Sequence, residues 1–152
     1  PSLRTRYQPD PRYHAVSYLI DTNVLSELRR KAPNPAVARW FAQRPAGTLY
    51  LSVLTLGELR KGIEALADAP RRLLLLDWLE TELSAFFSGR ILPIDAAIAD
   101  RWGHMVAIAG RPLPAIDSLL AATAAHHGLI MVTRNLRDVQ GLGVQVLDPW
   151  AD

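Results

Sequence analysis

The chain has 152 residues, of which 49% are hydrophobic and 21% charged, and its formal net charge is +2. This length and apolar content predict one folded domain with a sizeable core and exclude a chain that is disordered throughout. The absence of cysteine excludes disulfides, zinc–thiolate sites and thiol nucleophiles. The small positive charge permits an anionic partner such as nucleic acid, although it is weak support by itself.

The first fifteen residues differ from the rest, because prolines and arginines are mixed there without a helical or strand period. We expect residues 1–15 to form a flexible N-terminal extension and residues 16–152 to form a single domain. No apolar run approaches the length of a membrane span, and no secretory signal opens the sequence. We therefore expect a cytoplasmic protein without membrane contact.

The stretch from Tyr18 to Leu28 organises the prediction. An apolar run ends at Asp21, and a helical pattern starts at once, with apolar residues at positions 24, 25 and 28. Residues 21–23 are of the types that cap helices. The stretch therefore predicts a strand, a polar turn and a helix, with Asp21 at the carboxyl end of the strand, where open parallel sheets bind ligands.

The rest of the chain alternates between the two patterns. After the first helix, which we expect to reach residue 30, helices are predicted over residues 35–43, from Ser52 or Thr55 to about 66, from about 73 to 87, and over 96–109 and 115–127. Strands are predicted over residues 49–52, 90–94, 129–133 and 144–147. With the strand before Asp21 there are five, and Pro93 places the strand at 90–94 at an edge of the sheet or ends it early. Such alternation favours a parallel sheet covered by helices on both faces.

This topology brings polar oxygen groups to one edge of the sheet. Asp21 ends the first strand, and Glu58 lies in the helix that leaves the second. Asp117 opens the helix that runs back before the strand at 129–133, while Asn135 and Asp138 follow the exit of that strand. Because the carboxyl ends of parallel strands lie at the same edge, we expect these groups to meet there.

Each acid also has a purely structural interpretation. Asp21 and Asp117 could simply cap their helices, and Glu58 could be a solvated helix residue. The helix that follows Asp117 is almost wholly apolar, so Asp117 would be the polar group at the mouth of a buried helix. His104, His126 and His127 do not suggest a metal site, since the last two lie in a final helical turn, where they suit the helix dipole.

The physical case for joining Asp21, Glu58 and Asp117 is a cation. Clustered carboxylates repel one another and raise one another's pKa values, a cost that a divalent ion removes. Oxygen ligands without cysteine select hard cations, namely Mg²⁺ or Mn²⁺. Such ions activate water and stabilise the leaving oxygen in phosphodiester hydrolysis.

Five blocks of sequence carry a resemblance to a known family. They are LIDTNVLSEL at 19–28, SVLTLGEL with KGI at 52–63, PAIDSLLAATA at 114–124, VTRNLRD at 132–138 and VLDPW at 146–150. In this order they resemble the PIN-domain family, and most closely the VapC/FitB-type toxins of type II toxin–antitoxin pairs. The resemblance covers about residues 16–150.

The resemblance implies an α/β fold, a three-layer α/β/α arrangement with a central, mostly parallel sheet. It also implies an endoribonuclease that uses Mg²⁺ or Mn²⁺. The family's acidic positions fall on Asp21, Glu58 and Asp117, as metal ligands and catalytic groups. Its fourth acidic position falls on Asn135, an amide, so that either Asn135 or the nearby Asp138 would complete the site.

The resemblance also suggests partners and substrate contacts. It implies an RNA substrate, a cognate antitoxin that silences the enzyme, operator DNA bound only through the antitoxin complex, and a homodimer. We expect substrate contacts at Thr22, Asn23, Thr133 and Arg134. A leucine-rich segment, residues 73–83, offers an apolar face for a dimer or an antitoxin, although core packing explains it equally well.

Two alternatives stay open. A phosphatase of the haloacid-dehalogenase type also places an aspartate after its first strand, but it usually has a second aspartate two residues later, where this chain has Asn23. The second alternative is a PIN module that has lost catalysis and acts by binding an antitoxin. Asn135 favours that alternative, whereas the intact Glu58 and Asp117 argue against it.

Overall fold

The core of the fold is a five-stranded parallel sheet. The structure is a computed structural model that describes residues 16–151, so the extension predicted for residues 1–15 lies outside the described residues. The strands are β1 (Tyr18–Ile20), β2 (Leu49–Ser52), β3 (Ile91–Leu92), β4 (Ile130–Val132) and β5 (Val146–Leu147). They lie in the order β3-β2-β1-β4-β5, and each neighbouring pair is parallel.

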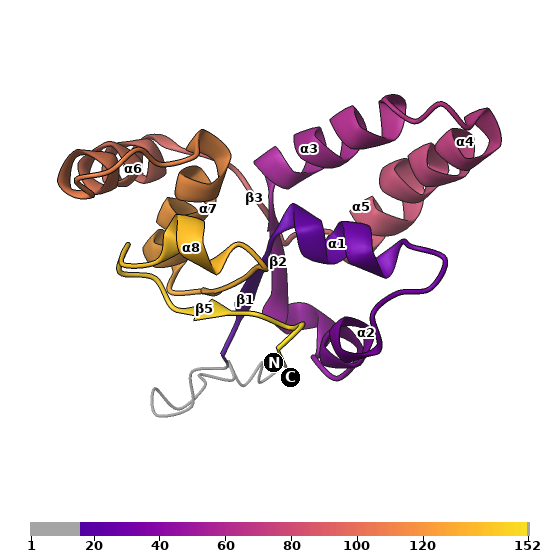
Figure 1. Cartoon of the computed structure of the whole chain (residues 1–152), viewed down its shortest axis with the longest axis horizontal. Helices are drawn as coiled ribbons and strands as arrows, with labels where there is room; N and C mark the ends of the chain where they lie inside the picture. Colours follow the sequence, from indigo (N-terminus) through magenta and orange to yellow (C-terminus); the bar gives the residue numbers. More distant parts are fainter. Residues whose placement is uncertain (1–15, 152) are drawn as a thin grey trace, which may run out of the picture.

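Helices connect the strands and cover both faces of the sheet (Figure 1). The connections hold α1 (Thr22–Leu28), α2 (Pro35–Ala42), η1 (Ala46–Thr48), α3 (Val53–Glu64), α4 (Ala69–Asp77), η2 (Trp78–Leu83), α5 (Ser84–Phe86), α6 (Ala96–Ile108), α7 (Ala115–His127) and α8 (Leu136–Val139). Figure 1 shows α6, α7 and α8 on one side of the strands and α1 to α5 on the other. The three-layer α/β/α prediction is confirmed, and the sheet is wholly rather than mostly parallel.

The two layers of core follow from the alternation of side chains along each strand. In β1, Leu19 packs with the α6–α7 side, while Ile20 packs with the α1–α4 side. In β4, Met131 and Val132 divide in the same way. Successive strand residues point to opposite faces, so a short apolar run buried on both sides can supply both cores.

Most predicted element ends are correct to within one or two residues. Asn34 caps α2, because its Oδ1 accepts a hydrogen bond from Ala36 N at 2.9 Å. Asp95 caps α6 in the same way through Ile98 N, and Ser52 caps α3. Gly128 ends α7 with a φ of 65°, a conformation that glycine adopts without strain. As Pro93 indicated, β3 ends early, at Leu92, and lies at an edge of the sheet.

Four predictions differ from the structure. The helix predicted from about residue 73 begins at Ala69, with Pro70 in its first turn. The strands are shorter than predicted, with β3 covering only Ile91–Leu92 and β5 only Val146–Leu147. The helix predicted up to residue 87 contains a π-helical stretch, η2, which the apolar spacing did not indicate. The four-residue helix α8 was not predicted, since it is too short to show a period. No helix among residues 16–151 is long and apolar enough to cross a membrane.

The packing of Phe87 gives a test of this core. Its side chain is fully buried in the cluster beneath α1 to α4, while the neighbouring Phe86 is 41% exposed. We expect Phe87→Ala to lower the free energy of unfolding by about 3–5 kcal/mol, because the truncation leaves a cavity. Phe86→Ala, the matched control, should cost about 1 kcal/mol. Urea denaturation measures both, and equal losses would contradict this placement of the two rings.

Candidate active site

Asp21 is the buried carboxylate at the centre of the candidate site. Its backbone N–H donates to Val132 O at 2.9 Å, which extends the β1–β4 ladder by one residue and holds Asp21 where the two strands end. The residue is only 4% exposed. Its Oδ1 accepts from Thr22 N at 2.7 Å, so Asp21 caps α1 as well as facing the site. From the sequence, helix capping and a role in the site were alternatives for Asp21. In the structure, its carboxylate caps α1 and also lines the candidate site.

Thr133 fixes the other oxygen of this carboxylate. Its hydroxyl donates to Asp21 Oδ2 at 2.7 Å and accepts from Asn135 N at 3.0 Å. The side-chain amide of Asn23 donates to both Asp21 Oδ2 and Thr133 Oγ1, each at 3.3 Å. Since Thr133 is fully buried, it reaches Asp21 and not the open cavity. Its hydroxyl therefore positions Asp21, and the substrate contact expected from the sequence stays a prediction.

A second cross-link joins α1 to α3. The hydroxyl of Thr22 donates to Glu58 Oε1 at 2.6 Å. This bond directs the Glu58 carboxylate toward the end of β1 although it comes from a different connection of the sheet. Thr22, like Thr133, thus orients an acid of the site.

The third acid comes from the opposite side of the sheet. Asp117 lies in the first turn of α7, whose following residues are buried as the sequence predicted. The pKa of Asp117 is raised from 3.8 to about 6, chiefly by burial. The negative charges of Asp21 and Asp138, a hydrogen bond with Asp138 and the charge of Glu58 contribute the rest, in that order of size. The four acids therefore lie close enough to repel one another.

The pKa of Asp21 is also raised, chiefly by burial. The hydrogen bonds from Thr133 and Thr22 oppose this rise, and the charge of Glu58 adds to it. Among the described residues, no lysine or arginine forms an ion pair with Asp21, Glu58 or Asp117. The protein thus assembles negative charge at this edge without neutralising it.

One cavity of about 520 Å³ contains most of the predicted site. Seven of the residues predicted from the sequence line it, namely Asp21, Thr22, Asn23, Glu58, Asp117, Arg134 and Asn135. Of the other two, Thr133 lies behind Asp21, and Asp138 interacts with Asp117 without lining the cavity.

Other residues line this cavity without having been predicted as part of it. Ser26 and Glu27 lie three and four positions after Asn23 on α1, so helical spacing from Asn23 would have found them. Arg30 lines the same cavity and pairs with Glu27 at 3.3 Å. Trp150, from the segment after β5, had no comparable signal.

The donor set of this cavity suits a hard divalent cation. It consists of carboxylate, hydroxyl and amide oxygens, and the amide oxygen of Asn23 is buried without a hydrogen-bond partner among the described residues. Within residues 16–151, however, no three acidic or histidine side chains stand close enough to enclose an ion. The residues therefore fit such an ion by chemistry and position, and the carboxylates would have to move closer to bind it.

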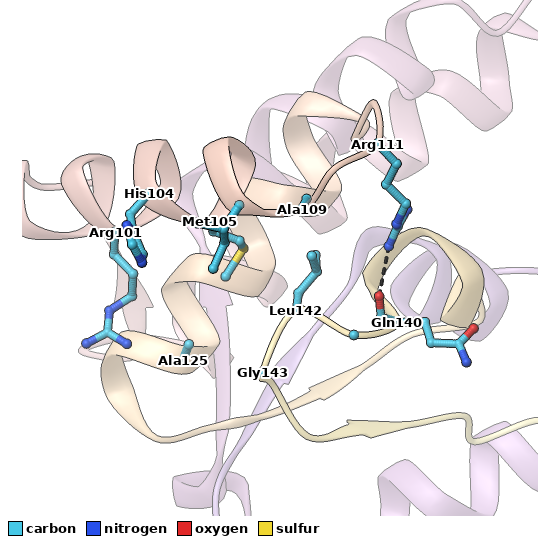
Figure 2. Close-up of a pocket in the computed structure, with 11 residues that line it drawn as sticks. Arg101, His104, Met105, Ala109, Arg111, Ala125, Gln140, Leu142 and Gly143 are labelled. Carbon is cyan, nitrogen blue, oxygen red and sulfur yellow. Dashed lines mark hydrogen bonds between the residues drawn. The ribbon is translucent and has the colours of Figure 1, made fainter.

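A larger cavity lies elsewhere and lacks this chemistry. It measures about 600 Å³ and lies between α6, the end of α7 and the loop at 140–143 (Figure 2). Figure 2 shows Arg111 across its rim, donating to Gln140 O at 2.8 Å. No acidic residue lines this cavity. Cavity size alone therefore does not identify the site that holds the acidic residues.

Comparison with known proteins agrees with the site. The PIN-domain family model matches residues 18–139. The chain is 35% identical to "VapC ribonuclease Y4jK" of Sinorhizobium fredii, over 87% of this chain and 96% of that protein. It is 36% identical to "Toxin FitB" of Neisseria gonorrhoeae, over 88% and 99%.

Solved structures agree as well. FitAcB from Neisseria gonorrhoeae has a TM-score of 0.83 at 34% identity, covering 88% of this chain and 98% of that one. FitAB bound to an IR36 DNA fragment has a TM-score of 0.82 at 32% identity, covering 88% and 95%. The chain therefore belongs to the PIN-domain family, in the group that includes the VapC and FitB toxins.

Proposed function

We propose that this protein is a metal-dependent endoribonuclease toxin, which hydrolyses RNA phosphodiester bonds until a cognate antitoxin silences it. The observation that carries the proposal is the cavity in which Asp21, Glu58 and Asp117 meet from three separate connections of the sheet. Relatives named as a ribonuclease and a toxin support the same activity. By the same resemblance, the protein acts in the cytoplasm as a homodimer and reaches operator DNA only through its antitoxin.

Asp21, Glu58 and Asp117 would hold Mg²⁺ or Mn²⁺, with Asp138 or Asn135 as the fourth group. When bound, such an ion neutralises the repulsion among the acids, activates water and stabilises the departing oxygen. The chain itself supplies orientation. Thr22 and Thr133 direct Glu58 and Asp21 by hydrogen bonds of 2.6 and 2.7 Å. Arg134 and Asn135, both exposed, flank the carboxylates at the rim, where a phosphate would approach.

We assign the fourth acidic role to Asp138. Asn135 lines the cavity, but its amide is uncharged, and its backbone N–H is used to fix Thr133. Asp138 lies one turn further on and interacts with Asp117 both by charge and by a hydrogen bond. A carboxylate in this position draws a cation more strongly than an amide does.

The proposal predicts loss of cleavage when Asp21 loses its charge. Asp21→Asn should cut a pool of structured RNAs at least about a hundredfold more slowly in Mg²⁺ or Mn²⁺, since a metal ion supplies several kcal/mol of stabilisation. EDTA should stop the wild-type protein to the same extent. Asp100→Asn, on an exposed part of α6, should cut like the wild type. Undiminished cleavage by Asp21→Asn would refute the proposal.

The same RNA pool decides between the proposal and a module that only binds. Folded wild-type protein, freed from its antitoxin and supplied with either metal, should leave cleaved products. If it leaves every RNA intact, the binding-only alternative gains, and Asn135 becomes the suspect residue. Asn135→Asp would then be expected to restore cutting.

Charge repulsion predicts a pH-dependent stability in EDTA. The pKa of Asp117 rises from 3.8 to about 6 on folding, so the folded state holds this proton more tightly than the unfolded chain. The Asp117 contribution is therefore present below pH 4 and is lost as the pH rises through about 6. Solvent screens this half-exposed group, so we expect a loss of about 1–2 kcal/mol.

Urea denaturation of Asp117→Asn measures this effect. The variant should show a smaller decline between pH 4 and pH 6, since only the contribution of Asp21 remains, and should exceed the wild type in stability at pH 8. Adding Mg²⁺ should stabilise the wild type at pH 8 more than the variant. Parallel pH profiles for the two proteins would show that the repulsion is absent.

Metal titration tests the role of Asp138. Asp138→Asn should raise the Mg²⁺ concentration needed for half-maximal cleavage by about tenfold, as expected for loss of one charged contact to the ion. Asn135→Ala should raise it less. The reverse order would assign the fourth position to Asn135.

A further inference from the structure

Trp150 and Arg134 form a pair at the rim of the acidic cavity. The metal-binding chemistry proposed for the carboxylates gives this pair no role. Both residues line the cavity together with Asp21, Glu58 and Asp117. The Arg134 guanidinium carbon lies 5.0 Å from the centre of the Trp150 ring, which is cation–π distance. An aromatic ring and a planar cation thus stand together where a substrate would enter.

Backbone hydrogen bonds in the segment after β5 hold Trp150 in this position. The backbone N–H of Trp150 donates to Asp148 Oδ1 at 2.9 Å, and that of Ala151 donates to Asp148 O at 3.2 Å. These bonds make a local turn directly after β5, with Pro149 buried inside it. Trp150 is only half-buried, so part of its surface stays open to the cavity.

Arg134 is the cation of this lining that is left without a carboxylate partner among the described residues. The other one, Arg30, pairs with Glu27 at 3.3 Å. Arg134 is exposed and forms no ion pair within the described part of the chain. Its contact with Trp150 holds the guanidinium at the cavity, and its N–H groups, which donate to no described residue, are available to a phosphate.

A comparison with Arg90 shows that not every such pair in this protein is of this kind. Arg90 lies over Phe86 and Phe87, but its N–H groups donate to Leu49 O and Phe86 O. Its N–H groups therefore already donate to backbone carbonyls, and it lines none of the cavities described above. The Arg90 pair is structural, whereas the Arg134 side chain lines a cavity and has no hydrogen-bond or ion-pair partner within residues 16–151.

Resting on the proposed nuclease function, we propose that Trp150 and Arg134 form a nucleotide-binding subsite that takes an unpaired nucleotide beside the bond to be cut. The base stacks on the exposed surface of the Trp150–Arg134 pair, and the guanidinium edge binds an adjacent phosphate. Proteins read single-stranded RNA by such stacking on aromatic and guanidinium planes. A base held within a duplex is already stacked, so the subsite selects loops and single strands.

Binding of a labelled single-stranded RNA of about ten nucleotides tests the subsite in the Asp21→Asn background, where cleavage is suppressed. Trp150→Leu should weaken binding about tenfold, the loss expected for one stacked base, and Trp150→Phe should weaken it less. The same RNA annealed to its complement should bind weakly and equally to all variants. Arg134→Gln should weaken single-strand binding and lower its salt slope by about 0.7, as for one lost phosphate contact.

Arg44→Gln is the matched control. Arg44 lies over Trp40 at 4.7 Å and so makes an equivalent contact, but it lines none of the cavities described above. Its variant should bind RNA like the parent. In the catalytically intact background, Trp150→Phe should raise KM with little change in kcat, because a stacked base contributes equally before and during the reaction.

The proposal is overturned if folded Trp150→Phe and Arg134→Gln bind single-stranded RNA as the parent does, whether or not Trp150→Leu folds. If the wild type still cuts RNA in that case, the subsite alone is wrong and the nuclease function stands. If the wild type neither binds nor cuts RNA, both fail. Equal losses for single-stranded and duplex RNA would also overturn the selection of unpaired nucleotides.

Discussion

The buried carboxylate of Asp21 is the constraint on which the site depends. A charge that is 4% exposed at the end of a strand must be satisfied by hydrogen bonds, since desolvation disfavours it. The donors come from the next residue, from Asn23 on α1 and from Thr133 after β4. The need to satisfy one acid therefore ties the first connection of the sheet to the fourth strand.

That connection has consequences for the other acids. Thr22 can reach Glu58 only because the capped start of α1 lies beside α3, and α1 and α3 pack in the same core. Asp117 arrives from the other face at the start of α7. The two faces of one parallel sheet thus deliver acids to a shared edge. The hydrogen bonds from Thr133 and Thr22 lower the pKa of Asp21 against the effect of burial, whereas the hydrogen bond with Asp138 raises the pKa of Asp117.

The sequence predicted the parts of this arrangement that depend on local pattern. The strand, the cap and the helix around Asp21 follow from the pattern of adjacent residues. The alternation of strands and helices predicts a parallel sheet, which places Glu58 and Asp117 at the same edge. The sequence does not indicate features that depend on how deeply a side chain is buried. Thr133 follows a strand as expected, but only the packed structure reveals that its hydroxyl is buried against Asp21. The π-helical stretch and Trp150 also had no local signal, because they depend on packing between distant segments.

The distribution of charge around the acids bears on how a phosphate and a divalent ion would bind together at this site. The acids lie at the end of the sheet without a paired cation in the described chain, while Arg30 and Arg60 are engaged with Glu27, Glu64 and Glu80. A phosphate approaching Arg134 must therefore come close to uncompensated carboxylates, which repel it. A divalent ion would remove that repulsion, and a bound phosphate would in turn strengthen the attraction of the ion. Binding of the two would then be coupled in both directions, as linkage requires. On the proposed function, an arginine held on an aromatic ring at the rim, rather than paired inside the acidic cluster, would let the cavity attract RNA without neutralising the acids proposed to bind the ion.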